Sequence, residues 1–184
     1  TMLATFLLGI AIGSWLASGR LSSDRRTAAT SFAWAQVGTG LFSLAAYLGI
    51  DSTPGWLESI AAKNGLRLLL DAGIAAAILL PGTLCIGATF PLAVRVLARS
   101  QDEASQASAR VYSWNTVGAI TGAVGAGFFL IPAIGFAWTL AIAVATNAGL
   151  AVAAGLRTRP RPRLAMVGAA LVLAALVITQ PGPP

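Results

Sequence analysis

The chain has 184 residues, of which 57% are hydrophobic and only 10% are charged. Soluble domains average about 25% charged residues, so this composition, with a mean hydropathy of +0.79, indicates that lipid surrounds most of the chain. It excludes disorder, which requires low hydrophobicity. The single cysteine, Cys85, excludes a disulfide scaffold, and the absence of histidine excludes His-based acid–base catalysis and most zinc sites.

Six apolar segments are long enough to be transmembrane helices, since a bilayer core of about 30 Å needs about 20 apolar residues per helix. The segments are residues 2–19, 28–50, 67–94, 111–134, 137–156 and 164–179. Backbone groups in lipid must pair within their own segment, and the segments lack the alternation of barrel strands. The predicted fold is therefore an all-α integral membrane domain, a six-helix fragment of a transmembrane bundle.

The basic residues predict the orientation of these helices. Six spans place three loops on one side, and these loops hold ten of the twelve basic residues: Arg20, Arg25, Arg26, Arg95, Arg99, Arg110, Arg157, Arg159, Arg161 and Arg163. The opposite side holds Lys63, Arg67 and the uncharged corner 135–137. The positive-inside rule makes the Arg-rich loops cytoplasmic and the N-terminal end external.

The net charge of +6 does not indicate a nucleic-acid partner, because the basic residues form short clusters between apolar runs. The preference for Arg over Lys and the richness in Ala and Gly suit a bacterial inner (plasma) membrane. The chain begins at Thr1 without a basic signal-peptide region, and it ends on 181–184 with no soluble domain following. We therefore expect a fragment of a longer membrane protein.

Residues 54–63 have a pattern of their own, between the second and third spans. Trp56, Leu57 and Ile60 fall on one helical face, and Pro54 suits a first helical position. One interpretation is a short interfacial helix with Trp56 at headgroup depth. The alternative is an irregular outer loop.

Ionisable groups within spans are costly and are the first candidates for a substrate path. Asp71 lies about one turn inside the third span, and Arg67 precedes it by four residues on the same face. The functional interpretation is a proton or cation site. The structural alternative, which we favour, is an ion pair near the interface with Arg67 extended towards water.

Neutral polar residues in the spans are further candidates for lining a path, Gln36, Thr89 and Asn115 among them. More often such residues form interhelical hydrogen bonds worth about 0.6 kcal/mol on average. Asn115 and Tyr112 open the predicted fourth span, where they can also act as helix-start groups or interface anchors.

Glycine pairs predict close helix packing, because they let backbones approach one another. Gly9 and Gly13 form one G-x-x-x-G pair, and Gly118 and Gly122 form another. Prolines predict kinks in the third and fourth spans by removing backbone donors. These prolines are Pro81, Pro91 and Pro132.

Three blocks of sequence resemble the multispanning spermidine synthase-like proteins, in which a membrane domain precedes a polyamine aminopropyltransferase domain. The first block is Thr5-Phe6-Leu7-Leu8-Gly9-Ile10-Ala11-Ile12-Gly13-Ser14-Trp15-Leu16-Ala17-Ser18-Gly19-Arg20-Leu21. The second is Gly87-Ala88-Thr89-Phe90-Pro91-Leu92. The third runs from Val111-Tyr112-Ser113-Trp114-Asn115-Thr116-Val117-Gly118-Ala119-Ile120 to Phe128-Phe129-Leu130-Ile131-Pro132-Ala133-Ile134-Gly135.

The resemblance implies a bundle similar to part of a major facilitator-type domain. The loop 19–26, with Asp24-Arg25-Arg26 as its charged core, also looks like the facilitator cytoplasmic loop, although it has one residue too many between Gly19 and Asp24 and lacks a second glycine. The synthase domain of such proteins uses decarboxylated S-adenosylmethionine and moves an aminopropyl group onto putrescine. None of that domain's glycine-rich loop or acidic motif occurs here, so no catalytic residue is carried over.

Three functions follow from these features. The chain is expected to anchor a cytoplasmic aminopropyltransferase domain and to be a candidate for moving polyamine or product, with putrescine or spermidine as partner. The first alternative is a facilitator-type transporter fragment for a small solute. The second is a non-catalytic scaffold whose glycine faces bind other helices.

The sidedness can be tested by labelling single cysteines placed at positions 25 and 161 in the intact protein. Because both positions fall in Arg-rich loops, we expect a membrane-impermeant maleimide to reach them from the same side only. A cysteine at position 63 is the control and should react from the other side. Labelling of positions 25 and 161 from opposite faces would overturn the predicted topology.

Overall fold

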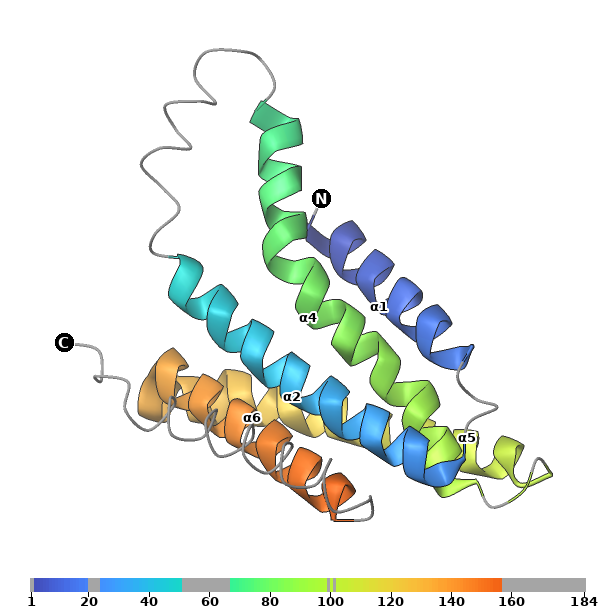
Figure 1. Cartoon of the computed structure of the whole chain (residues 1–184). Coiled ribbons are helices and arrows are strands. Elements are labelled where there is room, and N and C mark those ends of the chain that lie inside the picture. Colours follow the sequence, from blue (N-terminus) through green and yellow to red (C-terminus); the bar gives the residue numbers. More distant parts are fainter. Residues whose placement is uncertain (1, 20–23, 51–66, 99, 101, 157–184) are drawn as a thin grey trace.

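The computed structural model describes residues 2–19, 24–50, 67–98, 100 and 102–156, which form helices and their connections with no strand among them (Figure 1). The helices are α1 (Met2–Ser18), α2 (Arg25–Ile50), α4 (Arg67–Leu97), α5 (Ala104–Val124) and α6 (Ile131–Gly155). A π-helical segment, η1 (Gly125–Leu130), joins α5 to α6. The all-helical class predicted from the sequence is confirmed for this part of the chain.

The prediction of six separate helices was wrong, because the described residues form four continuous helical runs. The predicted fourth and fifth spans belong to one run that extends from Ala104 to Gly155. Only Gly135 departs from helical backbone within α6, with φ 80° and ψ 169°, a conformation that glycine adopts at little steric cost, and this break confirms the corner predicted at 135–137. The predicted span 164–179 and the predicted interfacial helix at 54–63 lie outside the described residues.

Two stretches of helix, Ala72–Leu97 and Ala104–Gly155, are long and apolar enough to cross a membrane. Helix α5 begins at Ala104, seven residues before the expected start, because the polar segment before Val111 is also helical. Tyr112 and Asn115 consequently lie in the interior of α5, and their predicted role at a helix start was wrong.

The helices pack in the order α1, α4, α2, α6, so that α4 contacts α1 and α2, and α2 contacts α4 and α6 (Figure 1). Helix α5 lies behind α2 in this view and has few contacts with the other described helices. The order therefore leaves α5 with a largely open surface.

Helices α1 and α4 meet at glycines. A Cβ added to Gly13 would fall 2.9 Å from the Cα of Leu84, and one added to Gly87 would fall 2.7 Å from the Cα of Ile10. On the same faces Gly9 lies against Thr83. The pair Gly9-x-x-x-Gly13 on α1 thus meets Thr83-x-x-x-Gly87 on α4 with backbones in contact.

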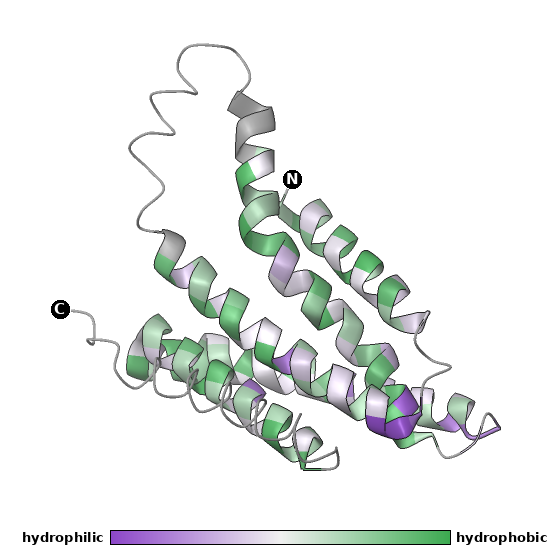
Figure 2. Ribbon diagram, in the orientation of Figure 1, coloured by the Kyte–Doolittle hydropathy of each residue, from purple (hydrophilic) through white to green (hydrophobic). Residues whose placement is uncertain are grey.

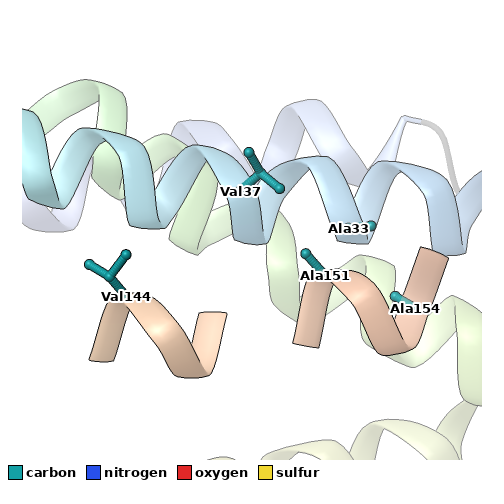
Figure 3. Close-up of a cluster of buried hydrophobic side chains, with 5 residues drawn as sticks. All are labelled: Ala33, Val37, Val144, Ala151 and Ala154. Carbon is teal, nitrogen blue, oxygen red and sulfur yellow. The ribbon is translucent and has the colours of Figure 1, made fainter. Parts of the chain in front are cut away.

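Alanines make the contact between α2 and α6. Ala33 and Val37 of α2 pack against Val144, Ala151 and Ala154 of α6 (Figure 3). The pairing is antiparallel, because the early residues of α2 meet the late residues of α6.

The interior of the described part consists of small side chains, whereas large apolar side chains face outward. Eleven of the fifteen buried hydrophobic residues are alanine, and the largest fully buried side chain is Val144. By contrast Trp15, Trp114 and Phe128 are 73%, 75% and 77% exposed. A soluble domain buries its large apolar residues, so this arrangement is the reverse of a soluble core.

The predicted kink residues occupy two settings. Pro81 and Pro91 lie inside α4, which bends along its course (Figure 1), as proline-containing helices do. Pro132 lies in the first turn of α6, where its missing N–H is tolerated, and the backbone leaves the helical conformation three residues later at Gly135.

Substitution of glycine by alanine is expected to have opposite effects on stability at a glycine of the α1–α4 contact and at a glycine on the open face of α5. Gly13→Ala should lower the free energy of unfolding by about 1–3 kcal/mol, because the new methyl group collides with the backbone of Leu84. Gly122→Ala, on the open face of α5, should raise it by about 0.5–1 kcal/mol through helix propensity. Thermal unfolding of the detergent-solubilised chain measures both, and equal shifts would contradict the assigned contact.

Candidate functional site

Charged side chains gather at one end of the bundle, which we call the Arg-rich end. All seven charged residues whose side chains the structure describes lie where α1 and α4 end and α2 and α5 begin: Asp24, Arg25, Arg26, Arg95, Asp102, Glu103 and Arg110. The largest hydrophilic patch in Figure 2 is at the start of α2. The late residues of α6 lie at this end as well, because Ala154 lines a cavity with Ala29 and Leu97.

Two neighbouring residues at this end cap two different helices, one at its start and the other at its end. The carboxylate of Asp24 accepts a hydrogen bond from the backbone N–H of Thr27 at 2.9 Å, which caps the start of α2. The guanidinium of Arg25 donates to the carbonyl of Val96 through Nε at 2.9 Å and Nη2 at 2.6 Å. This carbonyl belongs to the last turn of α4, whose acceptors lack partners within the helix, so Arg25 both caps α4 and complements its negative end.

The structure places the predicted path residues on three different helices. The backbones of Arg67 and Asp71 lie in the first turns of α4, but their side chains lie outside the described part. Thr89, on α4, donates to the carbonyl of Ile86 at 2.6 Å in its own helix. Asn115 is exposed on α5.

Among the predicted path residues whose side chains the structure describes, Gln36 on α2 is the one that is buried, with 8% of its surface exposed. The other two buried polar side chains are satisfied within their own helices: Thr39 donates to Ala35, and Thr83 donates to Leu79 and Leu80. Of the predicted path residues, Gln36, Thr89 and Asn115 have side chains that the structure describes, and none of these three lines either of the two cavities described below.

The larger cavity is a groove of about 550 Å³ between α1, α2 and α4. Its lining residues are Gly13, Leu16, Ala17, Ser31, Trp34, Ala35, Leu84, Cys85, Ala88 and Leu92. Ala17, Ala35 and Leu92 also form a buried cluster. The groove exists because α1 and α2 both pack on α4, and small side chains at the contacts leave the space between them unfilled.

A smaller cavity of about 210 Å³ lies between α2, α4 and α6 near the Arg-rich end. It is lined entirely by apolar residues, among them Ala29, Phe32, Val96 and Leu150. Such a lining offers no group to orient a polar ligand, so the larger groove is the better candidate site.

The groove was not predicted from the sequence, and neither was the α4 side of the glycine contact, Thr83 and Gly87. Thr83-x-x-x-Gly87 carries the same small-residue spacing as Gly9-x-x-x-Gly13, so the sequence contained a signal for it. Ser31, Trp34 and Cys85 carried no comparable signal, because their place in the groove depends on the faces that three helices present to each other.

Comparisons with family models, with curated protein sequences and with solved structures found no match to this chain.

The Arg25 contact predicts a difference between two adjacent arginines. Arg25→Gln should lower the free energy of unfolding by about 0.5–1.5 kcal/mol, since two exposed hydrogen bonds to Val96 are lost or weakened. Arg26→Gln is the matched control, because its exposed side chain makes no hydrogen bond to another described residue, and it should change stability by less than about 0.5 kcal/mol. Thermal unfolding in detergent compares the two variants, and equal losses would contradict the capping role of Arg25.

Proposed function

We propose that this chain is the membrane-embedded portion of a spermidine synthase-like protein, and that it anchors a cytoplasmic aminopropyltransferase domain at the bilayer. The observation that carries the membrane part of the proposal is the reversed distribution of side chains, with alanine and glycine at the helix contacts and large apolar residues outside. Lipid tails are as apolar as leucine, so burying large residues between helices brings no hydrophobic gain there.

The placement of charge supports the same proposal. The described charged side chains lie at one end, where α1, α2, α4 and α5 begin or end and α6 also ends. An array of helices whose described charged side chains lie at one end suits a bilayer with a cytoplasmic, Arg-rich side. The facilitator-like bundle, the external N-terminal end and the bacterial inner membrane are the finer parts of the proposal, and they rest on the sequence.

The synthase part of the proposal rests on the three blocks of resemblance. The Gly87–Leu92 block lies in α4, where Gly87 meets α1 and two further residues of the block, Ala88 and Leu92, line the groove. The block therefore supplies helix contacts in this chain and not catalytic groups. Decarboxylated S-adenosylmethionine and putrescine are proposed as substrates of the domain that this chain anchors.

A second candidate, a scaffold that binds other helices, is favoured by one observation. Gly118 and Gly122 of α5 have no atom of another helix within 4 Å of an added Cβ in the described part of the chain. A glycine face of this kind suits a further helix. The transporter alternative rests on the sequence alone.

The proposed anchor is tested in the intact protein that carries this chain, expressed in bacterial membranes. We expect the protein to resist alkaline carbonate extraction and to require detergent, and inverted vesicles to transfer aminopropyl groups from decarboxylated S-adenosylmethionine to putrescine. Recovery in the soluble fraction would overturn the membrane part. Integral protein without aminopropyl transfer would overturn the synthase part alone.

Uptake of labelled polyamine distinguishes the anchor from the transporter. The anchor proposal expects no saturable uptake and therefore no change in flux with Asp71→Asn. Uptake that this variant abolishes would establish the transporter alternative, since a carboxylate is the natural counter-charge for a polyamine.

A further inference from the structure

The groove between α1, α2 and α4 has the dimensions of a ligand site, since its volume of about 550 Å³ lies within the roughly 300–1,000 Å³ of such sites. We propose that it holds one acyl chain of an anionic phospholipid whose headgroup lies at the Arg-rich end. This inference rests on the proposed membrane location and is independent of the synthase activity.

The form of the groove suits a narrow flexible chain. Along α4 it extends from Leu84 to Leu92, which is about 12 Å at the helical rise per residue. The two exposed lining residues, Leu16 of α1 at 55% and Trp34 of α2 at 47%, mark its open side. An acyl chain in the surrounding bilayer has direct access to that side.

The chemistry of the lining excludes a charged occupant. None of the ten lining residues is a carboxylate, an ammonium or a guanidinium group, and the polar side chains among them are Ser31, Trp34 and Cys85. A polyamine in this groove would lose its hydration without gaining a counter-charge, which is strongly unfavourable. The groove is therefore not the polyamine path.

The surroundings of one end of the groove favour an anionic headgroup. Leu92 precedes Arg95 by one helical turn, and Ser31 follows Arg25 by six residues, or about 9 Å of helix. Three arginines and one aspartate lie at the start of α2 and the end of α4. This positive balance complements a lipid phosphate, and a basic side chain near the surface favours anionic lipid by about fivefold.

The first test uses the full chain in nanodiscs that contain a small fraction of phosphatidylglycerol with a diazirine in the middle of one acyl chain. After illumination, mass spectrometry should find the groove peptides of α1, α2 and α4 labelled about fivefold more than exposed α5. Ala88→Trp, which fills the groove, should remove this excess, whereas Ala123→Trp on exposed α5 should leave it. Uniform labelling, or an excess that survives Ala88→Trp, would overturn the proposal.

The second test leaves the sequence unchanged and so does not depend on how Ala88→Trp folds. Cys85 is the only cysteine and is half-buried in the groove, so its reaction with a small apolar maleimide reports occupancy. Reloading lipid-stripped protein with phosphatidylglycerol should slow the reaction about fivefold more than phosphatidylcholine with the same chains does. If Cys85 is equally unreactive without lipid, a protein segment or a second copy fills the groove and the proposal fails.

The two proposals fail in different ways. A chain recovered without detergent would overturn the membrane location, and the groove proposal with it. A chain that remains integral but shows neither excess labelling nor lipid protection of Cys85 would overturn the groove proposal alone.

Discussion

Close approach of helix backbones is the constraint on which this structure depends. Where the solvent is as apolar as the side chains, burying a leucine or phenylalanine between helices brings no hydrophobic gain, and attraction comes from dispersion contacts at short range. Gly13 and Gly87 allow α1 and α4 to touch at their backbones, and alanines do the same for α2 and α6. The large side chains are left on the outside of the described helices.

The polar groups follow from the same constraint. Buried hydroxyls such as that of Thr83 donate to carbonyls of their own helix, because water is absent from the interior to accept them. The charged side chains that the structure describes lie at the Arg-rich end, where Arg25 donates hydrogen bonds to the carbonyl of Val96 on another helix. Asp24 and Arg25, two residues of the segment that resembles the facilitator loop, thus cap the start of α2 and the end of α4.

Packing by small residues also creates the groove. Ala17, Ala35 and Ala88 allow α1 and α2 to pack closely on α4. Their side chains are too small to fill the space between these helices, which remains as the groove. In the described part of the chain, the predicted path residues Gln36, Thr89 and Asn115 lie on three separate helices.

The sequence by itself determined the all-helical class and the starts and ends of α1, α2 and α4 to within a few residues. It also determined that arginines gather at one end. These properties depend only on the length of apolar segments and on the order of charges along the chain. Tertiary structure alone decided which faces meet. The partner of Gly9 and Gly13 on α4 and the groove around Cys85 both depend on the relative rotation of helices. Glycine and alanine spacings recur on several faces of these helices, and only the packed arrangement selects those that come into contact.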